Sequence, residues 1–472
     1  MLVAFTVIGA TVLGRLPEAL VAVVGISLAV WIAVRPQRGI LLAVALVPLD
    51  GLRLPLGIDG TVASWKEGLA LFTAACAVIS AQKVARRTRP DWFWWLVALV
   101  GVAAISFGIH QSKAALWGMK LDFIYLTLTY AAWRCPLNAK DRDRFVSIIM
   151  GIGTLAAGYG VVQQLLGHER LHELGYEYNS VLRFNGGFLR SISTFALPFS
   201  FGFFMIMVIV IGLPVALSDL TRWRNRLFLV VTPLLVVGLV TSIVRTAMLG
   251  LLVGVLYLGI RRYRSIIAVL VPLGLVALFF IPGSSATSAL SSDSTKARSA
   301  NWTENIDAIT GRPFGLGVGE TGAAKARAYG QTVEEQAAAF NIDLNQPDSD
   351  VYTPVLGANG VYQPDNYYVK TVIELGVLGL WFLIRVLYGA VRESRALERV
   401  PDRTDAALGV GITAFLLAAI FSMFFATYLE LFPMDAYFWL LLGVTAATVR
   451  EYRATPDSPA TAAPAAAAGG AR

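Results

Sequence analysis

The chain has 472 residues, of which 56% are hydrophobic and only 15% are charged. Soluble domains carry roughly 25% charged residues, so this composition excludes a string of soluble domains. Apolar runs of about 17–25 residues recur along the whole sequence, and each is long enough to cross a bilayer. Their continuous character excludes an outer-membrane β-barrel, and the 2 cysteines exclude a disulfide scaffold.

The apolar runs predict an all-α, polytopic transmembrane helix bundle of about 12–14 spans. Taken in chain order, the predicted spans are about 1–14, 18–34, 39–52, 66–82, 91–109, 114–133, 143–166, 192–217, 227–242, 244–260, 265–283, 366–389, 406–427 and 431–449. The first run lacks a basic leader and a cleavage site, so we expect a span rather than a signal peptide.

The formal net charge of +8 resides mostly in short basic segments between spans. Basic clusters such as those at 134–144 and 392–403 all fall on one side, which predicts a cell (plasma or inner) membrane protein with both termini cytoplasmic. The charge therefore indicates topology, and nucleic acid is not an expected partner. Four parts follow, namely an N-terminal transmembrane bundle (1–283), an extracytoplasmic loop (284–365), C-terminal transmembrane helices (366–449) and a disordered cytoplasmic tail (450–472).

Charged residues stand at the predicted extracytoplasmic mouths of three spans. Arg190 precedes one span, Arg245 begins another, and Asp365 and Asn366 precede a third. Arginine on this side opposes the topology bias, and it can pair with phosphate oxygens in a bidentate manner. The alternative is an arginine that snorkels to the lipid headgroups.

Three stretches carry a resemblance to a known family, the O-antigen ligase and polymerase superfamily of membrane glycosyltransferases. Asp365-Asn366, nine residues, then Gly376 and Gly379 is similar to the family's His-[Asn/Ser/Gln]-x9-Gly-x-x-Gly signature, with Asp in place of His. The segment RTAML that begins at Arg245 is similar to an Arg-x3-Leu element of the family.

The third stretch, RSISTF, begins at Arg190 and resembles the family's arginine-containing segment before a Phe/Pro-rich span. A further segment, GRPFGLG at 311–317, resembles its Pro-[Phe/Leu]-Gly-x-Gly turn. These motifs follow the family order along roughly residues 185 to 385.

The resemblance implies an enzyme of the cell envelope that transfers a glycan outside the membrane with inversion. The implied donor is a glycan on a polyprenyl diphosphate such as undecaprenyl diphosphate, and the implied acceptor is a hydroxyl of a glycan or glycolipid. No metal, cofactor or nucleotide sugar is expected. Arg190 and Arg245 would stabilise the departing diphosphate, and Arg183 is a substitute for that role.

Asp365 stands where the family has histidine. A carboxylate can act as the base that takes the proton of the acceptor hydroxyl. The alternative is that Asp365 only caps the following helix, and Asn366 either orients the sugar or shares that cap.

Two further charged residues, Lys120 and Glu374, are substrate-binding candidates inside predicted spans, where charge is costly and is often functional. For Lys120, pairing or snorkelling is the competing interpretation. A lipid-linked glycan transporter or flippase remains an alternative function, and it predicts charges near the bilayer midplane and internal repeats. A scaffold membrane protein would need none of these charges, and the sequence does not separate a ligase from a polymerase.

Overall fold

The computed structural model describes residues 16–57, 64–80, 89–178, 181–185, 188–263, 309–328 and 364–454. In these ranges the chain is nearly all helical, and the predicted all-α, polytopic bundle is confirmed. The predicted spans at 1–14 and 265–283, most of the loop at 284–365 and the tail from 455 lie outside the described residues.

Within the described ranges, 6 helices are long and apolar enough to cross a membrane. These are α5 (Phe93–His110), α8 (Ala139–Glu173), α9 (Pro198–Ser218), α10 (Trp223–Thr241), α17 (Tyr367–Leu397) and α18 (Arg403–Ser422). The other α-helices are α2 (Leu16–Val34), α3 (Gln37–Leu46), α4 (Trp65–Ile79), α6 (Lys113–Phe123), α7 (Leu126–Arg134), α11 (Arg245–Arg261), α15 (Gly322–Ala328) and α19 (Met434–Ala454). Two 3-10 helices, η1 (Val47–Arg53) and η3 (Tyr428–Glu430), and the hairpin strands β1 (Arg183–Asn185) and β2 (Phe188–Arg190) complete the set.

Helix α9 is the centre of the bundle. Its sequence is apolar on every face, which is typical of a helix buried on all sides. Of the residues in its most apolar stretch, 94% are buried. It packs against α8, α10, α11 and α18. Helix α19 has the same role in the other half, where it packs on α7 and α17.

In three predicted spans the helix boundaries differ from the prediction. The run at 114–133 is two helices, α6 and α7, which meet at Ile124 and Tyr125 instead of continuing. The run at 39–52 becomes α3 followed by η1, and the run at 192–217 becomes helical only at Pro198. Proline at the first helical turn is favoured because its fixed φ suits the helix and it has no N–H to leave unbonded.

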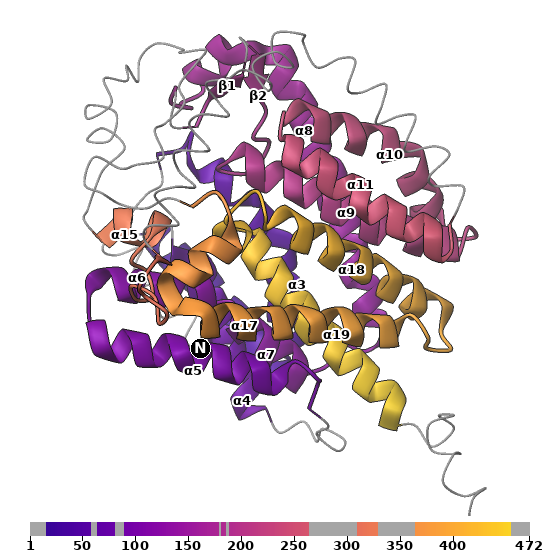
Figure 1. Cartoon of the computed structure of the whole chain (residues 1–472). Helices are drawn as coiled ribbons and strands as arrows, with labels where there is room; N and C mark the ends of the chain where they lie inside the picture. The colour runs from indigo at the N-terminus through magenta and orange to yellow at the C-terminus, as the bar shows by residue number, and fades with distance from the viewer. Residues whose placement is uncertain are drawn as a thin grey trace, which may run out of the picture.

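The candidate residues gather at one end of the bundle. The amide of Tyr367, at the start of α17, donates to the carbonyl of Met423, just beyond the end of α18 (2.8 Å). The start of α9 lies beside the start of α11, where a Cβ on Gly202 would meet Ser242 at 3.0 Å. The hairpin of β1 and β2 and α15 lie toward this same end (Figure 1). Glu430 of η3 lies 3.5 Å from Lys370 in the first turns of α17.

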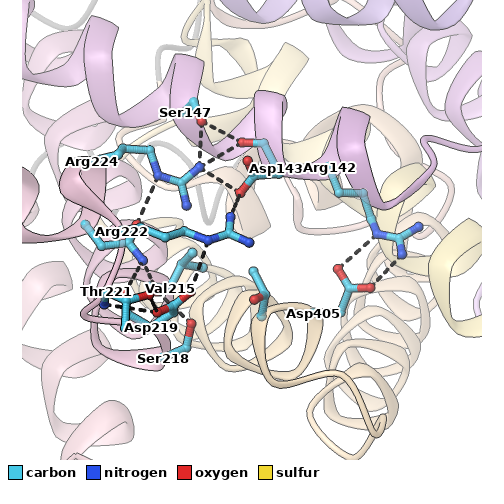
Figure 2. Close-up of polar contacts among 12 residues, drawn as sticks. Arg142, Asp143, Ser147, Val215, Ser218, Asp219, Thr221, Arg222, Arg224 and Asp405 are labelled. Carbon is cyan, nitrogen blue, oxygen red and sulfur yellow. Dashed lines mark hydrogen bonds and ion pairs between the residues drawn. The ribbon is translucent and has the colours of Figure 1, made fainter.

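The opposite end carries the basic segments, and many of their charges are paired. Arg142 donates to both carboxylate oxygens of Asp405 (2.9 and 2.6 Å), and Arg222 and Arg224 converge on Asp143 (2.6 and 2.8 Å) (Figure 2). The bidentate pair joins α8 to α18, and the converging arginines join α8 to the start of α10. The end predicted to be cytoplasmic is therefore fastened by ion pairs between helices.

Candidate active site

Two arginines face each other across the hairpin. In the antiparallel register of β1 and β2, Arg183 is the Cα partner of Arg190. Both side chains are half-buried. Like charges placed directly opposite each other destabilise a hairpin, so the protein maintains this pair at a cost.

Helix α8 holds the hairpin in place through two adjacent glutamines. Gln163 accepts the amides of Ile192 and Ser193 (3.1 and 2.7 Å) on its side-chain oxygen. Gln164 donates to the carbonyl of Leu189 (2.7 Å), which neighbours Arg190. Sequence reasoning missed both glutamines, although two adjacent amides inside a predicted span are themselves unusual.

The third arginine, Arg245, is the first residue of α11 and follows a strained turn. Ile243, two residues earlier, has φ of 50°. A β-branched residue in this region is rare and is held there only by its surroundings. The turn is fastened to β2, because Arg190 donates to the carbonyl of Ser242 (3.4 Å) and Ser191 donates to that of Thr241 (2.9 Å).

We call Arg183, Arg190 and Arg245 the arginine triad, because Arg183 is the Cα partner of Arg190 and Arg190 contacts the turn that precedes Arg245. The pKa of Arg190 is lowered to about 10, first by burial and then by the positive charges of Arg183 and Arg245. Burial also lowers the pKa of Arg183. The guanidinium of Arg190 further lies 5.0 Å from the ring centroid of Phe199. A half-buried cluster of positive charge that disfavours its own ionisation is suited to an anion.

The structure corrects the assignment of the α17 cap. The side chain of Asn366 accepts the amides of Tyr368 and Val369 (2.9 and 3.2 Å), so Asn366 is the N-cap of this helix. The alternative in which Asp365 caps α17 is wrong, because Asp365 lies one position too early. Its side chain is exposed at the mouth of the bundle.

The glycine-rich segment at 311–317 docks on a break in α17. Gly376 has φ of 69° and ψ of −171°, which interrupts the helix. The break leaves carbonyls of the preceding turn without helical partners, and the segment supplies them: Leu316 donates to Ile373 (2.6 Å) and Gly317 to Glu374 (3.0 Å). A Cβ on Gly376 would lie 2.1 Å from the carbonyl oxygen of Pro313, so only glycine permits this approach.

Of the two candidates inside spans, Glu374 belongs to a buried charge network. Lys370 on α17 lies 2.8 Å from Asp122, 2.9 Å from Glu374 and 3.5 Å from Glu430. Thr321, in the segment that precedes α15, donates to Glu374 (2.6 Å). The network thus ties together α6, α17, η3 and the described part of the long loop.

Lys120 lies apart from Lys370 and pairs with Glu67 on α4 (2.9 Å). Its contacts therefore agree with the alternative in which Lys120 forms an ion pair. The sequence analysis selected Glu374 and missed Lys370 and Glu430. The spacing of Lys370 and Glu374, four apart in an otherwise apolar run, could have revealed the pair. Among the described residues there is no group of three or more His, Cys, Asp or Glu side chains placed to hold a metal ion.

The fold and these contacts describe a polytopic membrane protein with an anion-suited arginine triad at one end. Residues 228–384 match the family model described as O-Antigen ligase. The match contains Arg245, Asp365, Gly376 and Gly379, and it confirms the resemblance predicted from the sequence. It supports an O-antigen ligase-like membrane glycosyltransferase as the general class of this protein. No curated protein matches the chain significantly.

Proposed function

We propose that this protein transfers a glycan from a polyprenyl diphosphate to an acceptor hydroxyl on the extracytoplasmic side, with inversion and without a metal ion. The observation that carries the proposal is the arginine triad, in which Arg183 is the Cα partner of Arg190 and burial, then the charges of Arg183 and Arg245, lower the pKa of Arg190. A diphosphate is an anion that guanidinium groups bind through charge-assisted hydrogen bonds. Arginine forks also suit the two phosphate groups geometrically.

In the proposed reaction, the acceptor hydroxyl attacks the anomeric carbon as the bond from that carbon to the diphosphate oxygen breaks. The departing diphosphate gains negative charge, and the guanidinium groups of Arg190 and Arg245 stabilise it more in the transition state than in the bound donor. Arg183 holds the donor through the same charge. Asp365 takes the proton of the hydroxyl.

The buried network has a supporting role in this proposal. Lys370 and Glu374 hold the segment before α15 against α17, whose first residues follow Asp365. Asn366 fixes the start of α17 as its cap. Glu374 then acts as a positioning residue rather than as a ligand of the donor, and Lys120 joins α6 to α4 through its pair with Glu67.

The test uses purified protein in lipid nanodiscs with a polyprenyl diphosphate-linked glycan as donor. Arg245→Ala is expected to reduce transfer by roughly 10²–10³-fold, the usual effect of removing one preorganised donor to a developing anion. Arg245→Lys should recover only part of the rate, because an ammonium cannot pair bidentately. A matched control is Arg262→Lys and Arg262→Ala, at an exposed position on the far end of the same helix. Near-normal transfer by Arg245→Ala would contradict the diphosphate role.

A further inference from the structure

A second basic site lies at the end of the bundle opposite the arginine triad. A cavity of about 440 Å³ is formed where the last turns of α17 meet the end of α19 and the residues before α5. Its polar lining comes from Asp91, Tyr388, Arg392, Arg395, Arg399 and Arg453. The glycosyl transfer proposed above uses none of these residues.

The charges around this cavity do not balance. Arg392 pairs with Asp91 (3.1 Å), and Arg453 pairs with the buried Glu393 (3.3 Å). The remaining two arginines are exposed and line the same cavity. Arg395 lies in the last turn of α17, with its guanidinium 5.9 Å from the ring centroid of Tyr257, and Arg399 lies in the turn that follows the end of this helix. Among the described residues, four arginines line the cavity with one carboxylate, Asp91, and Glu393 beside it is a second, so positive charge is in excess by two.

Aromatic side chains place the cavity at a membrane interface. Arg385, seven residues before Arg392, lies about 10 Å further along α17, given a rise of about 1.5 Å per residue. Its guanidinium lies 4.5 Å from the ring centroid of Trp95, 5.8 Å from Tyr388 and 6.0 Å from Trp381. Tryptophan and tyrosine are enriched where hydrocarbon meets headgroups, and a caged arginine there points its charge toward the headgroups.

The wall of the cavity continues into an exposed apolar surface. Trp381 and Tyr388 on α17 are 52% and 61% exposed, and Trp94 on α5 is 60% exposed. In a helix bundle that spans a membrane, such a surface faces acyl chains. A ligand that fits both parts has an anionic head and an apolar tail.

We propose that this cavity binds the headgroup of an anionic phospholipid. The lipid phosphate pairs with Arg395 and Arg399, and the acyl chains run along Trp94, Trp381 and Tyr388. Basic pockets between transmembrane helices on the cytoplasmic side bind anionic headgroups in this manner. The apolar wall favours a lipid over a free phosphate ion, because the ion would leave that wall unused.

The test measures how strongly the intact protein, purified in phosphatidylcholine, retains added phosphatidylglycerol in native mass spectrometry. The wild type should retain phosphatidylglycerol in preference to phosphatidylcholine. The variant Arg395→Gln/Arg399→Gln should bind phosphatidylglycerol about thirty-fold more weakly, since each arginine near the surface contributes about five-fold. The matched control Arg226→Gln/Arg262→Gln removes the same charge from exposed positions outside the cavity and should leave retention unchanged.

Several outcomes would overturn the proposal. They are equal retention of both lipids by the wild type, unchanged retention in the double variant, and equal losses in the double variant and its control. Inorganic phosphate that displaces phosphatidylglycerol at concentrations comparable to the lipid would show an ion site instead of a lipid site. The single variant Arg399→Gln, with a smaller loss expected in the same direction, keeps the test decisive should the double variant not fold in phosphatidylcholine.

Discussion

Lys370 is the positive centre of three buried carboxylates, and its side chain is 2% exposed. A buried ion pair is costly to form but far more costly to break from one side, because the partner charge is then left uncompensated in a medium of low dielectric constant. The residue therefore determines whether Asp122, Glu374 and Glu430 can be buried together.

Lys370→Met is expected to destabilise the protein by about 3–5 kcal/mol, the range for breaking a buried pair from one side. The carboxylates can then relieve their repulsion by binding protons, which they do more readily at low pH. The folded variant takes up more protons than the unfolded chain, so the loss should be larger at pH 8 than at pH 5. Thermal unfolding in detergent at both pH values measures this. Lys113→Met, at an exposed position on α6, is the control and should change little at either pH.

Asp365 and Asn366 are neighbours with separable roles. Asn366→Ala removes two hydrogen bonds to amides of the first turn of α17 and should cost about 1 kcal/mol of stability, as for other N-cap losses. Asp365→Asn preserves shape and removes proton-accepting power, so transfer should fall by roughly 10²–10⁴-fold with little change in unfolding temperature. The two measurements are transfer rate and thermal unfolding on the same samples. Wild-type turnover by Asp365→Asn would remove Asp365 from catalysis.

At the scale of single elements, the break in α17 is the feature most sensitive to one atom. Gly376→Ala places a Cβ in the position of the Pro313 carbonyl and also requires a positive φ that alanine disfavours. We expect the segment at 313–317 to detach, which should expose it to limited proteolysis and lower the transfer rate. Gly101→Ala in α5, where a Cβ would meet nothing within 4 Å, is the matched control and should be neutral or slightly stabilising. Equal proteolysis of the two variants would refute the docking role.

The elements differ in how far the sequence predicts them. Hydropathy locates the long helices because membrane crossing requires continuous apolar runs. Hydropathy does not predict that 114–133 forms two helices. The charges of Lys120 and Asp122 in this run are paired with side chains that only the folded chain brings near. Lys370 and Asp122 are 248 positions apart, and no local pattern encodes that approach.

The site was predictable to a similar degree. The motif order brought Arg190 and Arg245 into one hypothesis, and in the structure Arg190 donates to the carbonyl of Ser242 in the turn before Arg245. The register that pairs Arg183 with Arg190 depends on the hairpin, whose strands have three residues each and are too short for a periodic signal. The cap on α17 depends on a shift of one residue, which lies within the usual uncertainty of helix boundaries.

At the scale of the whole molecule, the two ends of the bundle have different chemistry. One end carries the arginine triad and the docked glycine-rich segment, and the other carries basic segments fastened by ion pairs (Figure 2). The excess of Lys and Arg in short connections predicts that the second end is cytoplasmic.

Accessibility to a membrane-impermeant thiol reagent tests this orientation in intact cells. Phe314→Cys, in the glycine-rich segment, should be labelled, and Leu220→Cys, in the α9–α10 connection, should be labelled only after permeabilisation. The wild-type side chains are 77% and 52% exposed. The native Cys76 and Cys135 are buried and give a low background. The reverse labelling pattern would invert the orientation and place the proposed reaction on the wrong side.

The contact between the glycine-rich segment and α17 has an evolutionary consequence. Backbone amides donate all three hydrogen bonds of this contact, from Leu316, Gly317 and Val377. The contact therefore depends on chain length and on φ angles rather than on which side chains are present. Related sequences can therefore vary at exposed positions such as Phe314. An insertion or a deletion of one residue between Pro313 and Gly317 would instead move the amides away from the carbonyls that they bind. We expect alignments of such relatives to show variable letters at this segment and an invariant spacing.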